Sequence, residues 1–112
     1  MYAQGWIRGY MSKSYDVERF MIHVVTTIER QLQLWDEIAE VNLLRDLTGG
    51  EVYYVIVRFG EKMFKVPLSE WDAQSLQDQS PFAVDRYIWR ELVKQGLLLG
   101  KTEGNYLTYC AI

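Results

Sequence analysis

The sequence contains few cysteines, which could form disulfides, and few prolines, which break helices and strands. Its 112 residues include one cysteine, Cys110, which excludes an internal disulfide and any site built from several thiolates. Only two prolines occur, and hydrophobic residues make up 49%, a composition unlike that of disordered or low-complexity chains. We therefore expect a globular protein from a reducing compartment.

Long apolar runs are also missing. The longest one, residues 52–57, is far shorter than the roughly 20 residues that a membrane span requires. The N-terminus does not show the charged and apolar regions of a secretory signal. These absences predict a cytoplasmic protein without a membrane partner.

Acidic charge is concentrated in the middle of the chain. Residues 36–80 hold nine acids and four cations, whereas the segments on either side each carry one excess cation, for a net charge of −3. Non-specific affinity for nucleic acid comes from cations that neutralise phosphates, so these charges argue against a protein coated all round by nucleic acid. A local contact with duplex DNA stays open.

The length and the periodicity predict one α+β domain over residues 1–112. Residues 1–13, which contain two glycines, are expected to form an irregular aromatic arm. Residues 14–47 are expected to be helical, because apolar residues recur every three or four positions after Ser14, a potential cap. A single helix of that length would need a partner, which predicts a homodimer.

A second interpretation of the helical segment remains open. The helix would break near residues 35–37, and residues 38–46 would then form either a second helix or a strand. Residues 51–68 predict a β-hairpin, because Val, Ile and Tyr are frequent on both sides of a Gly60-Glu61 turn. Pro67 indicates an edge strand or the end of a strand.

The last part, residues 69–112, predicts two helices and a second hairpin. Ser69 would cap the first helix, Ser80 and Pro81 would begin the second, and Gly96 would end it. Residues 97–109 would form the hairpin. Three cations on the second helix make a stripe at i, i+4 and i+8 beside an aromatic side chain, namely Arg86, Arg90 and Lys94 beside Tyr87.

This order of elements resembles the second half of a winged helix-turn-helix domain. Residues 81–95 would be the recognition helix, and residues 97–109 the wing. The resemblance implies that the stripe enters a major groove while Lys101 on the wing lies near phosphate; the implied DNA-binding residues are Arg86, Tyr87, Arg90, Lys94 and Lys101. The stripe has two other interpretations, a solvated helix face or a protein contact, since winged domains also bind proteins.

No motif for catalysis, a cofactor or a metal stands out. The glycines of residues 96–102 are separated by three residues instead of the four of a phosphate-binding loop. His23, the only histidine, has no recognisable partner nucleophile. We expect no enzyme, no cofactor and no metal, although a minor metal site at Asp36, Glu37 and Glu40 is an alternative.

Aromatic residues are abundant, with four Trp, eight Tyr and four Phe. Within the arm they accompany a cation, as is typical of interface hot spots, and the predicted partner-binding residues are Tyr2, Trp6, Arg8 and Tyr10. The favoured function is a small non-enzymatic regulator or inhibitor that acts through protein–protein contacts. A winged-helix transcriptional regulator that binds DNA is the alternative. The size and acidity also resemble those of small phage and mobile-element proteins that bind host factors.

Overall fold

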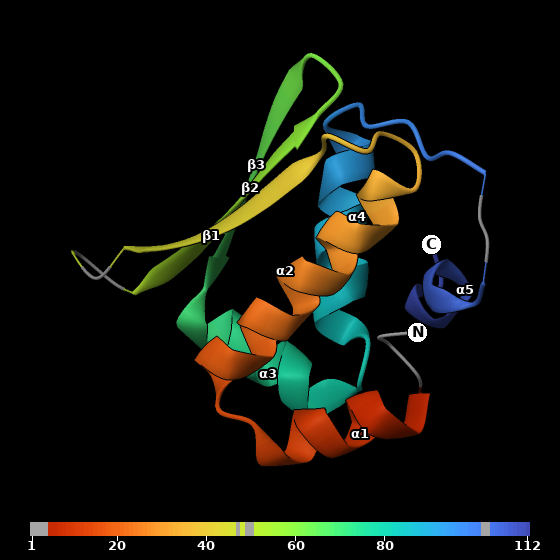
Figure 1. The fold of residues 1–112 in the computed structure, drawn as a ribbon. Helices are drawn as coiled ribbons and strands as arrows, with labels where there is room; N and C mark the ends of the chain where they lie inside the picture. The colour runs from red at the N-terminus through yellow and green to blue at the C-terminus, as the bar shows by residue number, and fades with distance from the viewer. Residues whose placement is uncertain (1–4, 47, 49–50, 102–103) are drawn as a thin grey trace.

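The computed structural model describes residues 5–46, 48, 51–101 and 104–112. Their elements, in chain order, are α1 (Gly5–Ser14), α2 (Val17–Gln33), β1 (Glu40–Asp46), β2 (Val52–Phe59), β3 (Lys62–Ser69), α3 (Glu70–Gln79), α4 (Ala83–Lys94) and α5 (Tyr106–Cys110) (Figure 1). The α+β class is confirmed as two N-terminal helices, a three-stranded antiparallel sheet and further helices.

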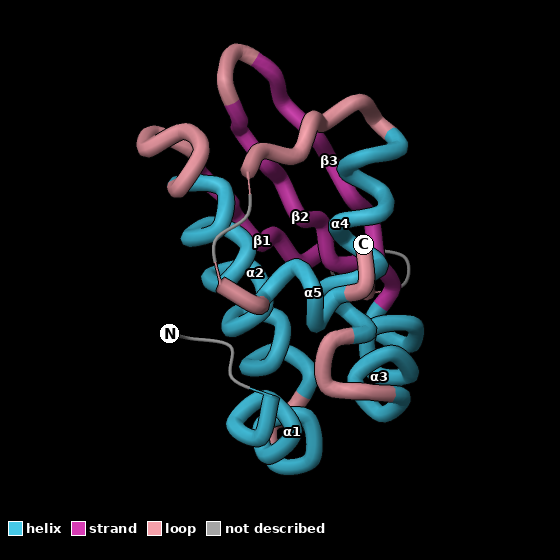
Figure 2. Tube along the Cα trace, turned by 90° about the vertical axis from the view of Figure 1, so that its right-hand side faces the viewer, coloured by secondary structure: helices cyan, strands magenta, loops and turns pink. Residues whose placement is uncertain are grey.

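The helices gather on one face of the sheet, whose strand order is β1-β2-β3 (Figures 1 and 2). Side chains alternate along β2, so Tyr53, Val55 and Val57 are buried against the helices. The core is completed by apolar side chains of α2 and α4, among them Ile28 and Trp89. No described helix lies on the opposite face, which therefore stays open.

The predicted hairpin of residues 51–68 is confirmed. Strands β2 and β3 pair antiparallel and are joined at Gly60, whose φ of 63° favours glycine. Pro67 lies on the edge strand β3, opposite Tyr54, where a missing N–H leaves the ladder intact.

The prediction of one helix over residues 14–47 is wrong, and the interpretation with a break and a strand is right. Helix α2 ends at Gln33 and β1 begins at Glu40. The connection is held in place by Asp36, whose Oδ2 accepts from the Gly60 backbone N–H at 2.8 Å. Asp16, instead of Ser14, caps α2. A dimer through one long helix therefore has no basis in this fold.

The expectation of an irregular arm over residues 1–13 is wrong from Gly5 onward, because Gly5–Ser14 is the helix α1. Two glycines lower the helix propensity of this segment, so its helical state depends on tertiary contacts. Tyr2 lies outside the described residues.

The predicted wing is also wrong. Residues 97–101 have no regular secondary structure, and Tyr106–Cys110 forms the helix α5. Tertiary burial favours a helix over a strand in this segment, because α5 places Tyr106, Leu107 and Cys110 in the core. The resemblance to a winged helix is thus not confirmed.

The predicted helix caps give a mixed result. Ser69 caps α3, as expected, through its hydroxyl, which accepts from the Asp72 N–H at 3.0 Å. Helix α4 begins at Ala83, two residues later than Pro81, and Phe82 precedes it without a side-chain cap. The chain leaves α4 at Gly96 with φ at 107°, in agreement with the prediction.

Candidate functional site

Arg8 lies at the centre of a buried polar cluster that joins three helices. Its guanidinium makes a two-pronged ion pair with Asp85 of α4, and the Nη2–Oδ2 distance is 3.0 Å. The Tyr106 hydroxyl of α5 donates to Asp85 Oδ2 at 2.5 Å and accepts from Trp89 Nε1 at 3.2 Å. The cluster fixes α1 against α4 and α5.

The charges of this cluster compensate each other inside the protein. Burial alone would lower the pKa of Arg8, but the adjacent Asp85 carboxylate outweighs it and raises that pKa. Burial raises the pKa of Asp85, against the opposing effect of Arg8. The rings of Phe20 and Phe82 lie 5.6 and 4.6 Å from the guanidinium carbon. The expectation that Arg8 is exposed for a partner is wrong, because the side chain is fully buried.

Trp6 and Tyr10 occupy the opposite side of α1 from Arg8. They are 77% and 66% exposed, respectively. At about 100° per residue, Trp6 and Tyr10 lie about 40° apart on the helix, whereas Arg8 lies about 160° from each. Residues four apart are neighbours on a helix surface, so the two rings form one outward aromatic pair.

A second contact anchors the end of α1. The side-chain amide of Gln77 in α3 donates to the carbonyl oxygens of Ser12 and Tyr15, at 3.2 and 2.8 Å. Beside it lies a groove of about 500 Å³ between α1 and the α3–α4 connection, lined by Gly9, Ser12, Lys13, Gln77, Asp78, Gln79, Ser80 and Pro81. The aromatic pair therefore stands on a helix that is held at its middle and at its end.

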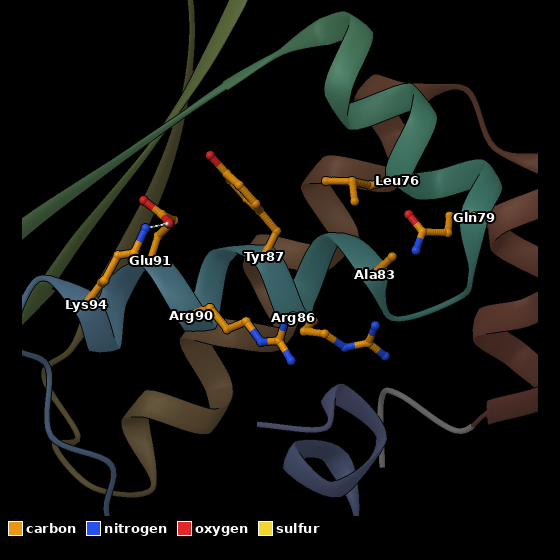
Figure 3. Close-up of a pocket in the computed structure, with 8 residues that line it drawn as sticks. All are labelled: Leu76, Gln79, Ala83, Arg86, Tyr87, Arg90, Glu91 and Lys94. Atoms are coloured by element: carbon orange, nitrogen blue, oxygen red, sulfur yellow. Dashed lines mark hydrogen bonds and ion pairs between the residues drawn. The ribbon is translucent and has the colours of Figure 1, made fainter.

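The predicted basic stripe also comes together in space. Arg86, Tyr87, Arg90 and Lys94 line one groove of about 310 Å³, along with Leu76, Gln79, Ala83 and Glu91 (Figure 3). Lys101 is not among its lining residues. The Lys101 carbonyl oxygen accepts from Trp35 Nε1 at 2.7 Å, in the loop after α4.

The cations of the stripe differ in the hydrogen bonds and ion pairs that they make. Arg86 donates through Nε to the Cys110 carbonyl oxygen at 2.8 Å, and Lys94 pairs with Glu91 at 3.0 Å. Arg90 is exposed and makes no hydrogen bond or ion pair with any described residue. Both arginines extend to the same side of α4 (Figure 3).

Helix α4 buries half of its 12 residues. Six of its residues are buried, namely Ala83, Val84, Asp85, Ile88, Trp89 and Leu92. The Tyr87 hydroxyl donates to the Pro67 carbonyl oxygen at 3.3 Å, which ties the stripe to β3. The other half of α4 is at least partly exposed, and this is the face that a groove-reading role would use.

Two titratable groups near the Arg8 cluster have shifted pKa values. Burial, followed by the charges of Arg8 and Arg30, lowers the pKa of half-buried His23 to about 4. Burial and then Asp85 raise the pKa of the Cys110 thiol to about 12. At neutral pH the histidine is an uncharged weak base and the cysteine is a protonated thiol.

Two of the three acidic residues proposed as a metal site, Asp36, Glu37 and Glu40, have other partners. Asp36 accepts from the Gly60 backbone, and Glu40 pairs with Arg58 at 2.9 Å. Within residues 5–46, 48, 51–101 and 104–112, no group of three or more His, Cys, Asp or Glu side chains is placed to hold a metal ion.

Comparison with protein-family models, with curated proteins and with solved structures gives no significant match. None of the helices in the described part of the chain is long and apolar enough to cross a membrane.

Proposed function

We propose that this protein is a small non-enzymatic binding protein that acts as a regulator or inhibitor through protein–protein contacts. The outward pair of Trp6 and Tyr10 on the anchored helix α1 carries this proposal. Trp and Tyr are the side chains that dominate interface energetics, and both are strongly exposed here. Because Arg8 and Gln77 already hold α1 in place, a partner would meet a rigid surface, which lowers the entropy lost on binding.

The test compares two variants that each remove exposed tryptophan. Trp6→Ala/Tyr10→Ala removes the aromatic pair, and Trp71→Ala is the matched control, since Trp71 on α3 is 80% exposed. Tagged proteins are used to capture partners from an extract of the source cells, and the affinity of each captured protein is then measured. A hot-spot residue contributes about 2 kcal/mol or more, so the double variant should bind at least about 30-fold more weakly.

The control and the wild-type protein should bind equally well. Circular dichroism spectra and melting temperatures show that each variant is folded. Unchanged affinity of the Trp6→Ala/Tyr10→Ala variant for every captured protein would refute the proposal.

A DNA-binding regulator is the second candidate. Arg90, which has no partner in the described part of the chain, lies beside Arg86 and Lys94 in one groove and favours it. It predicts that random duplex DNA is bound at low salt, that added salt weakens binding, and that Arg90→Glu/Lys94→Glu abolishes it. The protein-contact proposal predicts no such binding. Fluorescence anisotropy of a labelled duplex distinguishes the two.

A further inference from the structure

The two edges of the sheet are closed to different extents. On the β3 edge, the Gln95 amide donates to the Lys65 carbonyl oxygen at 2.9 Å and accepts from the Lys65 N–H at 3.4 Å. The next outward residue, Pro67, has no N–H, and its carbonyl oxygen accepts from Tyr87. These contacts leave no room for another strand beside Lys65 and Pro67.

As far as the described residues go, the β1 edge is closed only at its beginning. The Val41 N–H donates to Glu29 Oε2 at 2.9 Å, and the Gln33 amide donates to the Ala39 carbonyl oxygen at 3.1 Å. Backbone groups of alternate residues point to the same side of an antiparallel strand, so Leu43 and Arg45 also direct theirs away from β2.

The outward N–H and C=O groups of Leu43 and Arg45 make no hydrogen bond to any residue that the structure describes. The end of β1 projects beyond the helices (Figure 1), and the Arg45 side chain, on the helix-covered face, reaches back to Glu18 of α2 and Glu70 of α3. An edge of this kind is a template for a further strand, and proteins commonly block it, as this chain does on β3. On β1 the block stops at Val41.

We propose that a second copy of this chain pairs with this edge, β1 against β1 and antiparallel, about a two-fold axis at Leu44. Because Glu29 closes the edge at Val41, the open stretch is residues 42–46, and Leu44 is its centre. Leu43 of each copy then exchanges both backbone hydrogen bonds with Arg45 of the other. The two three-stranded sheets become one six-stranded sheet.

The side chains of the open stretch suit pairing with themselves. Leu44 is 55% exposed on the open face and meets Leu44 of the second copy. Asn42 lies opposite Asp46, and residues 42–46 carry one cation and one acid, so no like charges stand directly opposite. The open faces of both copies, with Tyr54, Ile56 and Met63, become continuous across the axis.

The first experiment measures molecular mass against concentration by analytical ultracentrifugation. The wild-type protein should approach twice 13.2 kDa as concentration rises. Leu44→Lys places two like charges opposite each other and should weaken the dimer at least 10-fold. Met63→Lys is the matched control, because Met63 is 63% exposed on the same face but belongs to β3, and it should dimerise like wild type.

A monomer mass for wild type at all concentrations would overturn the proposal, as would a Leu44→Lys variant that dimerises normally. Both variants change exposed side chains on the open face, so the fold should be kept, and circular dichroism verifies this.

A second experiment tests the register. Residues opposite each other in a non-hydrogen-bonded antiparallel pair have Cα atoms about 4.5 Å apart, within disulfide range. Leu44→Cys should therefore form a covalent dimer on mild oxidation, whereas Asn42→Cys, which lies opposite Asp46, should not. Equal cross-linking of the two variants would contradict the two-fold axis at Leu44. Trp6 and Tyr10 are unchanged in all these variants, so the result is independent of the partner-binding test.

Discussion

Arg8 has a different role from its neighbours on α1. A charged group loses several kcal/mol of solvation when it is buried, and only a close partner with good geometry offsets that cost. Asp85 supplies the opposite charge, and Tyr106 supplies a further hydrogen bond to the same carboxylate. The residue therefore positions Trp6 and Tyr10 without itself meeting a partner.

Removal of one member of this ion pair should be costly. Arg8→Met leaves the Asp85 carboxylate buried without its cation. Asp85→Asn leaves the Arg8 guanidinium buried without its anion. Each single variant should lose about 3–5 kcal/mol of unfolding free energy, measured by urea denaturation. The double variant should lose clearly less than the sum of the two. Additive losses would show that the pair is not coupled.

His23 predicts a pH dependence of stability. Its pKa is about 4 in the folded protein and 6.5 when unperturbed, so the unfolded chain binds a proton first as pH falls. Stability is therefore lost between about pH 6.5 and pH 4. The contribution at pH 5 should be about 1 kcal/mol, after allowance for the partial exposure of the ring.

The His23→Gln variant removes this contribution while keeping a polar side chain. Its unfolding free energy should fall less than that of wild type between pH 7 and pH 5. Parallel pH profiles of the two proteins would contradict the shifted pKa.

At the scale of elements, the loop after α4 is fitted closely to Trp35. A Cβ atom on Gly100 would lie 2.5 Å from Trp35 Cδ1, so only glycine allows this approach. The same indole donates to the Lys101 carbonyl oxygen and packs edge-on against Phe59 and Trp89. Trp35 thereby joins the loop to the sheet and to α4.

Gly100→Ala should displace this loop and destabilise the protein by about 1–3 kcal/mol. The fluorescence of Trp35 should change with it. Gly9→Ala is the matched comparison, because its Cβ would meet Pro81 Cγ at an ordinary 3.9 Å within α1. That variant should gain about 0.5–1 kcal/mol through helix propensity. Thermal unfolding measures the stability of both variants. Equal changes in stability would contradict the predicted close contact between Gly100 and Trp35.

The elements that the sequence predicts correctly are those with local signals. Helix α2 forms despite β-branched residues, because its apolar spacing is continuous, and the β2–β3 hairpin follows from its turn and its alternation. The stripe residues converge because helical spacing alone places Arg86, Arg90 and Lys94 on one side.

The elements that sequence reasoning missed depend on distant contacts. Helix α1 contains glycines and is held by Arg8, whose partner Asp85 is 77 residues away. Helix α5 has strand-forming residues, yet the bond from Tyr106 to Asp85 and the burial of Leu107 select a helix. The burial of Arg8 has no local signal at all.

For the molecule as a whole, Cys110 offers a measure of how often the core opens. Its thiol is fully buried and has a pKa of about 12, so a thiol reagent at pH 8 should react only after opening. Wild type should be protected and become fully reactive in denaturant. Arg8→Met should react faster, about 10-fold for each 1.4 kcal/mol lost. Rapid labelling of native wild type would contradict this prediction.

The members of the Arg8–Asp85–Tyr106 cluster are far apart in the sequence, which determines when α1 can dock during protein synthesis. Helix α1 is made first, but ten residues are too few for a stable isolated helix. Its anchor on α4 is made much later, and the hydrogen bond that completes the anchor waits for Tyr106. Helix α1 therefore completes its docking only after Tyr106 has been synthesised, and Trp6 and Tyr10 take up their fixed positions no earlier than that.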